Sequence, residues 1–442
     1  MRNRGWGTRR QKGMRRSLGT RLLSVLVVLL VAGAGLAACG DDDGLPSADD
    51  DSEGDGPAVL AVSQGVDRSP PDAAAPIEAL AAGFNDAGFA LLRTLPDTEN
   101  VVFSPSSIGH ALLLARDAGD ESTRAAIDRA FTLPAGLAAH QAWNTIDQAL
   151  ADPGDPEVTV TVADRIWPRL GLRPDQSWVD LLAAEHGADV QPLDLAGDPD
   201  TSRQIINDWV ADKTEDLIPE LLPDGFLDPN SVLVLTDALY FKARWETVFG
   251  KYGTEQADFT RLDGTTVPVE LMRELELTDP RGQGDGFVGA EIPYAGGEYS
   301  MLVLVPDEGR FAEVRSRLNQ QLLDEIDASF TTGPYELLLP PWEDDEQIDL
   351  LAWLTDLGIA PGAFPGISSD AYLGAAVHGA DITVDEWGTV AAAATGLGFE
   401  ESGPPEPELT IRADRPFLYV IRHRDSGLVL FAGQVTDPTS GG

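Results

Sequence analysis

The sequence predicts one large domain of mixed α and β structure, an α+β fold. Its 442 residues are 43% hydrophobic, which is enough to bury a substantial core. Apolar residues recur at both helical and strand periods between residues 77 and 437, and no internal repeat or low-complexity linker divides this range. We therefore expect residues 77–437 to form a single domain, preceded by N-terminal segments of another kind.

The chain begins with a segment typical of a lipoprotein signal peptide, which we expect not to be part of the fold. Eight basic residues precede the apolar run LLSVLVVLLVAGAGLAAC at residues 22–39. The run ends in small residues and Cys39, the single cysteine of the chain, and so resembles a bacterial lipobox, whose thiol is lipidated. We predict a signal peptide at residues 1–38 and lipidation at Cys39; an ordinary secretory signal and an uncleaved membrane helix are the alternatives.

An acidic tether is predicted from the lipidated cysteine to residue 76, because DDDGLPSADDDSEGDG is too polar to pack. Removal of residues 1–38 takes away eight basic and no acidic side chains, and leaves 23 Lys+Arg against 73 Asp+Glu, a net charge of about −50. This charge excludes nucleic acid and anionic membrane surfaces as partners. We expect an exported protein of the cell envelope or cell surface, held to the membrane by lipid at Cys39.

Within the domain, helices and strands alternate. Helical spacing relates Ile77, Leu80, Phe84 and Leu91, and also appears in IINDWVADKTEDLI at residues 205–218. Strands are predicted at Val158–Trp167, where Val and Thr alternate, and at the apolar runs Ser231–Phe241 and Tyr299–Val305. Residues 262–265 and 425–427 are predicted as hairpin turns.

No catalytic constellation is apparent. The sequence has no HExxH, GxSxG, GxGxxG or GxxxxGK[ST] motif, and its only thiol is assigned to lipidation. The five histidines are His110, His140, His186, His378 and His423, and none of them belongs to a recognisable motif. We therefore predict that the protein is not an enzyme and has no catalytic residue, cofactor or metal site.

The stretch EWGTVAAAATG, which begins at Glu386, is the most informative segment. Glycines bracket its four alanines, so at most seven residues remain for a helix, too few for stability. Its small side chains instead suit a strand that enters a crowded sheet. No proline occurs from residue 386 to 403, and Pro404, Pro405 and Pro407 then follow closely. Because proline cannot donate to a ladder, only the first part of this segment can join a sheet.

The chain resembles the serpin family over residues 77–437. The matching segments, in order, are VVFSPSSIGHALLLARDAG (101–119), ADRIW (163–167), IINDWVADKT (205–214), LVLTDALYFKARWETVF (233–249), FTRLDGTTVPVELM (259–272), VHGADITVDEWGTVAAAATG (377–396) and DRPFLYVIRHRDSGLVLFAGQVTDP (414–438). The resemblance implies a multi-helix domain with three β-sheets, an exposed reactive-centre loop at residues 386–407, and a monomer.

The resemblance also implies a mechanism. A target protease, a serine endopeptidase or a cysteine endopeptidase, would attack the loop and form an acyl-enzyme. The freed N-terminal half of the loop would then insert into the large sheet and drag the protease with it. The implied hinge consists of Glu386, Gly388, Thr389, Val390, Ala391, Ala392, Ala393 and Ala394. Insertion of about a dozen residues would gain on the order of 10 kcal/mol in ladder bonds.

Two counts place the scissile bond differently. Counting forward from the hinge glycine puts Ser402 before the bond, whereas the local match Ser402-Gly403-Pro404-Pro405-Glu406 puts Glu401 there. We favour the bond Glu401–Ser402. A glutamate before the bond suits a protease that tolerates acidic or small residues and excludes a trypsin-like one.

The family's sheet-opening cluster corresponds to Ser104, Ser107, His378, Asp237 and Trp245, with Asp237 in place of the family's Asn. We expect Asp237 to lie beside His378 and to favour its imidazolium, so that stability falls as pH rises through the titration of that histidine.

Two residues of the hinge also depart from the family pattern, namely Trp387 and Val390. The small residues that follow Thr389 favour an irreversible inhibitor. The alternatives are a non-inhibitory serpin that acts as a binding protein, and a lipid-anchored solute-binding protein.

Overall fold

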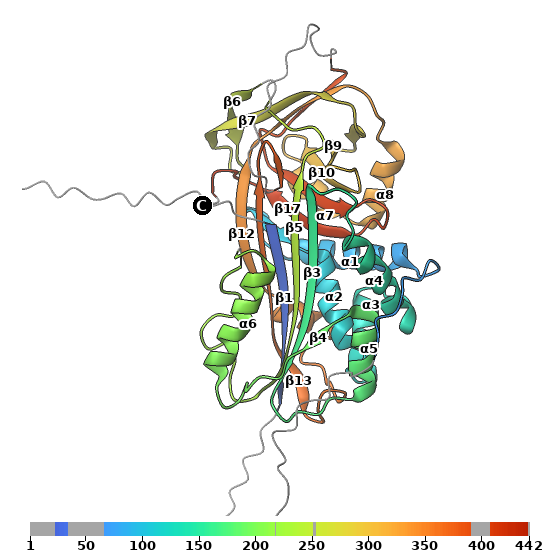
Figure 1. Ribbon diagram of the computed structural model, residues 1–442. Coiled ribbons are helices and arrows are strands. Elements are labelled where there is room, and N and C mark those ends of the chain that lie inside the picture. Colours follow the sequence, from blue (N-terminus) through green and yellow to red (C-terminus); the bar gives the residue numbers. More distant parts are fainter. Residues whose placement is uncertain (1–22, 34–65, 217, 251–252, 390–406, 441–442) are drawn as a thin grey trace, which may run out of the picture.

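The computed structural model describes residues 23–33, 66–216, 218–250, 253–389 and 407–440 (Figure 1). Within these ranges the chain forms three β-sheets and nine helices, which confirms the predicted α+β class. Cys39, the hinge residues from Val390 onward, and the bond Glu401–Ser402 lie outside the described residues.

The largest sheet has seven strands. They are β4 (Asp189–Val190), β3 (Val158–Pro168), β5 (Ser231–Arg244), β1 (Leu23–Gly33), β14 (Gly388–Thr389), β13 (Ala371–Val384) and β12 (Trp342–Asp349). Both β1 and β14 lie between β5 and β13 and pair antiparallel with each of them. The predicted apolar run forms β5, whose first eleven residues are all buried because strands flank it on both sides.

The other two sheets carry the rest of the strands. The six-stranded sheet runs β2 (Val101–Phe103), β17 (Val429–Val435), β16 (Phe417–His423), β10 (Tyr299–Pro306), β9 (Phe287–Pro293) and β8 (Arg281–Gly284). The four-stranded sheet runs β15 (Leu409–Arg412), β11 (Tyr335–Leu339), β7 (Thr266–Leu277) and β6 (Thr254–Thr260). The predicted turns connect β6 to β7 and β16 to β17, so both hairpins are confirmed.

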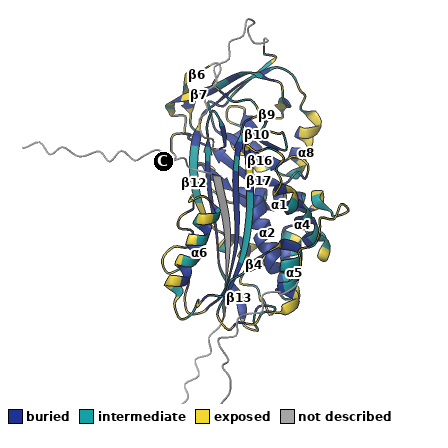
Figure 2. Cartoon of the chain, in the orientation of Figure 1, coloured by how far each residue is buried: buried dark blue, intermediate teal, exposed yellow. Residues whose placement is uncertain are grey.

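The helices are α1 (Ile77–Leu92), α2 (Pro105–Arg116), α3 (Glu121–Ala130), α4 (Leu137–Leu150), α5 (Gln176–His186), α6 (Pro199–Lys213), α7 (Phe311–Arg317), α8 (Gln320–Ser329) and α9 (Leu351–Asp356). Every residue of α2 is buried, so this helix forms the centre of the molecule (Figure 2). Ser104 caps its first turn, and Pro105 occupies the first helical position, where no amide is needed.

Helix α6 covers the opposite face of the large sheet and buries Ile206 and Val210 with Trp167 and Val234. Helix α6 ends at Lys213, although helical spacing was predicted as far as residue 218. It ends there because Glu215 and Asp216 adopt left-handed backbone angles. No helix within the described ranges is long and apolar enough to cross a bilayer.

Two N-terminal boundaries differ from expectation. Residues 1–38 were expected to lie outside the fold, but Leu23–Gly33 forms β1 inside the large sheet. A run of Val and Leu suits a strand flanked on both sides as well as it suits a lipid environment. The tether was expected to extend to residue 76, yet Arg68 ion-pairs with Asp147 and donates to Asn144 at 2.9 Å, so contacts with the domain begin earlier.

Candidate functional site

The start of the predicted hinge lies at one end of the large sheet. After β13, the chain reverses and Gly388 pairs with Arg244 and Thr389 with Ala243, both on β5. Thr389 also pairs with Val384 on β13. The two residues of β14 are therefore held as strand between β5 and β13, and both are buried.

The reversal before β14 has a local cause. The Asp385 carboxylate accepts hydrogen bonds from the N–H groups of Trp387 at 2.8 Å and Gly388 at 3.2 Å, and so closes a side-chain turn. Gly388 has φ +154°, and a Cβ there would lie 2.2 Å from the carbonyl oxygen of Ala243. Position 388 therefore requires glycine, because β14 approaches the backbone of β5 too closely for any side chain.

Trp245 and Tyr294 fix this end of the sheet. The Trp245 indole donates to the carbonyl of Asp385 at 3.0 Å, and its backbone N–H donates to the carbonyl of Trp387 at 2.8 Å. The two rings stack at 4.5 Å, and the Tyr294 hydroxyl lies 2.6 Å from Thr389 Oγ1. Burial raises the pKa of Tyr294 far above its ordinary value, so this hydroxyl stays neutral. The predicted tryptophan thus contacts the turn that delivers the hinge into the sheet.

A second group of predicted residues meets near the middle of the sheet. The N–H of Ser104 donates to His378 Nε2 at 3.0 Å, which joins the start of α2 to β13. Ser104 Oγ accepts from the N–H of Ser107 at 3.0 Å and lies 2.9 Å from Ser106 Oγ. These residues are all buried, so Ser104, Ser107 and His378 are brought together as the sequence suggests.

Asp237 behaves differently from the prediction. Its Oδ2 lies 2.5 Å from His110 Nδ1, on α2, and not beside His378. Val27 of β1 pairs with both Asp237 and His378, so this strand lies between the two residues. The expected pair is therefore wrong for this arrangement, because β13 faces the first turn of α2 while β5 faces the turn that carries His110.

His110 begins a row of buried histidines that sequence reasoning did not identify. His110 Nε2 lies 2.9 Å from His186 Nδ1, and His186 Nε2 lies 2.8 Å from His140 Nδ1. His140 Nε2 in turn lies 2.7 Å from a carboxylate oxygen of Asp117. The row connects the large sheet to α4 and α5. No motif could reveal it, because its members come from separate elements.

The electrostatics of this row centre on His110. Burial lowers its pKa, but Asp164 and Asp237 outweigh burial and raise the pKa to about 10. Burial raises the pKa of Asp164 to about 7, although His110 opposes this shift. Burial and the neighbouring His110 lower the pKa of His186 well below its ordinary value. The raised pKa of His110 favours the imidazolium form of this residue.

His110, Asp164 and Asp237 also have ligand atoms within 4.8 Å of one another, a spacing that could hold a metal ion. The sequence predicted no metal site. In the structure His110 Nδ1 lies 2.5 Å from Asp237 and 3.3 Å from Asp164, so the three groups already balance one another as an imidazolium between two carboxyl groups.

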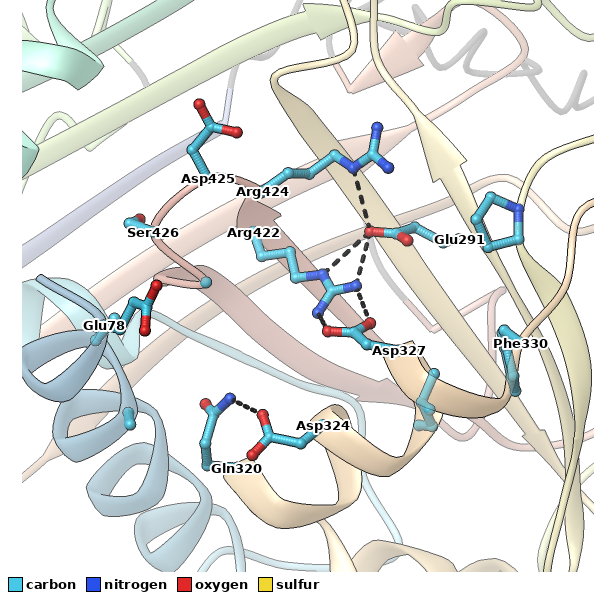
Figure 3. A pocket seen from close by; sticks show the side chains of 15 residues that line it. Glu78, Glu291, Gln320, Asp324, Asp327, Phe330, Arg422, Arg424, Asp425 and Ser426 are labelled. Carbon is cyan, nitrogen blue, oxygen red and sulfur yellow. Dashed lines mark hydrogen bonds and ion pairs between the residues drawn. The ribbon is translucent and has the colours of Figure 1, made fainter.

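A pocket of about 440 Å³ lies between α1, α8 and the turn from β16 to β17 (Figure 3). Arg422 lies in its wall and is bound by Glu291 at 2.8 Å and by Asp327 at 2.6 Å. Glu78, Asp324 and Asp425 also line it. Because the guanidinium is already neutralised and the other charges shown are mostly acidic, this pocket is a poor site for an anionic ligand.

Comparisons with known proteins agree with this architecture. The sequence profile of the family "Serpin (serine protease inhibitor)" matches residues 82–438. Mouse antithrombin-III is 27% identical over 358 residues, which cover 77% of this chain and 77% of that protein. Serpin A3-3 of Bos taurus is 31% identical over 376 residues, which cover 81% of this chain and 89% of that protein. A serpin-like protein of Methanosarcina acetivorans is 29% identical over 353 residues, covering 77% and 82%.

Solved structures share the fold. The native state of the thermophilic serpin tengpin has a TM-score of 0.74 at 23% identity and covers 86% of this chain and 99% of its own. Human thyroxine-binding globulin, in complex with thyroxine, has a TM-score of 0.72 at 23% identity and covers 82% of this chain and 100% of its own. Uncleaved ovalbumin has a TM-score of 0.73 at 25% identity, with coverage of 82% and 100%.

Proposed function

Because this chain belongs to the serpin family, whose members generally target serine proteases, we propose that it is an irreversible inhibitor that acts by cleavage and strand insertion of its reactive loop. The target is a serine endopeptidase outside the cytoplasm, and a cysteine endopeptidase is the second choice. The protease hydroxyl attacks the carbonyl carbon of Glu401, the bond to Ser402 breaks, and the amine of Ser402 leaves with the proton. The serpin remains joined to the protease as an ester.

The observation that carries this proposal is the position of β14. Gly388 and Thr389 lie between β5 and β13 in the orientation that an inserted loop requires. If the same register continues, each residue after Thr389 takes the next partner along β5, and Glu401 reaches Ser231, the first residue of that strand. The loop before the proposed scissile bond thus has the length of β5.

The driving force is the formation of ladder hydrogen bonds along this path. Insertion of residues 390–401 adds about a dozen residues, each worth about 1 kcal/mol or more, so the gain is on the order of 10 kcal/mol. That value is comparable with the stability of an ordinary domain, so it suffices to distort the attached protease. The residues that must enter are small and uncharged through Gly396, and none of them is proline before Pro404.

We also propose that the protein is exported and anchored by lipid at Cys39. The basic residues, the apolar run and the small residues before Cys39 support export and lipidation. The acidic residues that follow support a solvated tether between the membrane and the domain.

The test is a mixing experiment with glutamyl-specific, elastase-like and subtilisin-like proteases. We expect one of them to form a complex that survives denaturing electrophoresis and to release a fragment that begins at Ser402, as identified by mass spectrometry. Cleavage without a complex by every protease that cuts the loop would refute the inhibitor.

A non-inhibitory serpin is the second candidate, since thyroxine-binding globulin and ovalbumin share the fold. The neutralised Arg422 in the pocket of Figure 3 argues against an anionic ligand there. The family match does not support the alternative of a solute-binding protein.

A further inference from the structure

The strand β1 lies in the place that the proposed mechanism reserves for the cut loop. It pairs antiparallel with β5 from Leu23 opposite Phe241 and antiparallel with β13 from Ser24 opposite Asp381. Figure 1 shows it, in blue, within the large sheet beside β5. The segment belongs to the apolar run that we predict to be part of the signal peptide.

The register of β1 on both neighbouring strands is the register that a continuation of β14 would take. On β5, Thr389 pairs with Ala243, so the continuing loop would place Ala391 opposite Phe241, which is the partner of Leu23. On β13, Thr389 pairs with Val384, so the loop would place Ala392 opposite Asp381, which is the partner of Ser24. Two neighbouring strands therefore give the same offset, and β1 begins where β14 ends.

The lengths agree as well. Strand β1 has 11 residues and reaches Ser231 of β5 and Ala371 of β13, which begin their strands. The loop residues from Ala391 to the proposed scissile bond would need the same stretch. The position between β5 and β13, which we call the slot, cannot hold two strands at once. Strand β1 and the inserted loop therefore exclude each other.

We call the N-terminal segment that contains β1 the leader. Its sequence favours strand formation more than the sequence of the loop does. Its sequence, LSVLVVLLVAG, has four valines, four leucines and one glycine, whereas AAAATGLGFE, at residues 391–400, has two glycines and four alanines. Valine is favoured in strands, while glycine and alanine are depleted in them.

Resting on the proposed insertion mechanism, we infer that the unprocessed leader is an intramolecular blocker of the inhibitor. While β1 fills the slot, the cut loop has no place to insert, and the protease hydrolyses the ester and departs. Removal of the leader opens the slot, so only the processed protein traps a protease. The strand that fills the slot before processing is thus β1, an apolar, uncharged segment of this chain itself.

The experiment uses the full-length chain made by cell-free synthesis without membranes, so that the leader is retained. The test variant replaces Val27 and Val28 with proline, because proline cannot donate to either neighbouring strand. The matched control replaces the same two residues with threonine, which keeps strand propensity. Hydrogen exchange measures protection of residues 23–33, and denaturing electrophoresis measures complexes formed per loop cleaved.

We expect amides of residues 23–33 in the wild type and the threonine control to exchange at least about 100-fold more slowly than in an unstructured peptide. We expect the proline variant to lose this protection and to form at least about tenfold more complex per cleavage.

Full exchange of residues 23–33 in the wild type would overturn the inference and leave the proposed inhibitor intact. Equal complex formation by the wild type and the proline variant would also overturn it. If the proline variant loses its protection and yet no variant traps a protease, the proposed function itself fails, and the blocking role fails with it.

Discussion

Replacement of Gly388 by alanine should convert the inhibitor into a substrate. Gly388 has φ +154°, a backbone conformation that side chains disfavour, and an added Cβ would lie 2.2 Å from the Ala243 carbonyl oxygen and 2.8 Å from Arg244 Cα. Both contacts are with backbone atoms of β5, which cannot rotate away. The variant must therefore move β14 out of the sheet, so that insertion starts from a detached hinge.

The size of the effect follows from the backbone strain. A residue held in such a region costs about 1–3 kcal/mol, and the same amount added to the insertion barrier slows insertion by about 5-fold to 150-fold. Hydrolysis of the acyl-enzyme is a reaction of the protease and should keep its rate. The stoichiometry of inhibition, measured as serpin consumed per protease inactivated, equals one plus the ratio of hydrolysis to insertion. The stoichiometry minus one should therefore rise by the same factor of about 5 to 150.

The matched control is Gly264→Ala. Gly264 has φ +81° in the turn between β6 and β7, and an added Cβ there meets nothing within 4 Å. This control carries backbone strain without the clash against β5, so its stoichiometry should equal that of the wild type. A Gly388→Ala protein with wild-type stoichiometry would refute the role that we assign to β14.

Three further outcomes are expected. Glu401→Arg should allow capture of trypsin, whereas Ser402→Arg should not if the bond is placed correctly; fragment masses decide between them. The free energy of unfolding should fall as pH rises from about 6.5 to about 10, because the pKa of His110 is raised to about 10 in the folded state and its stabilisation is lost above the unfolded value. Denaturant titrations at several pH values should show a weaker fall in His110→Gln, and an identical slope would contradict the assignment. Cys39→Ser should abolish lipid labelling and release the protein from membranes, and persistent lipid labelling would disprove the anchor site.

Much of the fold could be predicted from local patterns. The near-continuous apolar run at Ser231–Phe241 predicted a central strand, and β5 is flanked on both sides. Gly388 lies in β14, whereas the four alanines that follow lie outside the described residues. The prediction at β5 succeeded because the burial of a strand follows from the apolar character of its own residues.

The remainder depends on contacts between distant residues. Asp237 was assigned to His378 by family position, but its partner is His110, 127 residues away, because the face of α2 decides the contact. The apolar run at Leu23–Gly33 has the composition of both a signal peptide and a buried strand, so its sequence alone cannot distinguish the two. Arg68 looked like part of a polar tether until its ion pair with Asp147 was seen.

The number of protons in the row of three imidazoles is fixed by the carboxylates of Asp237 and Asp117 at its two ends. It makes four contacts, from Asp237 through His110, His186 and His140 to Asp117, and each contact needs one hydrogen. Three neutral rings bring only three. A fourth proton must therefore reside in the row. The raised pKa of His110 and the lowered pKa of His186 favour its place on His110, at the end of the row beside β5. Loss of that proton anywhere leaves two lone pairs facing each other somewhere along the line.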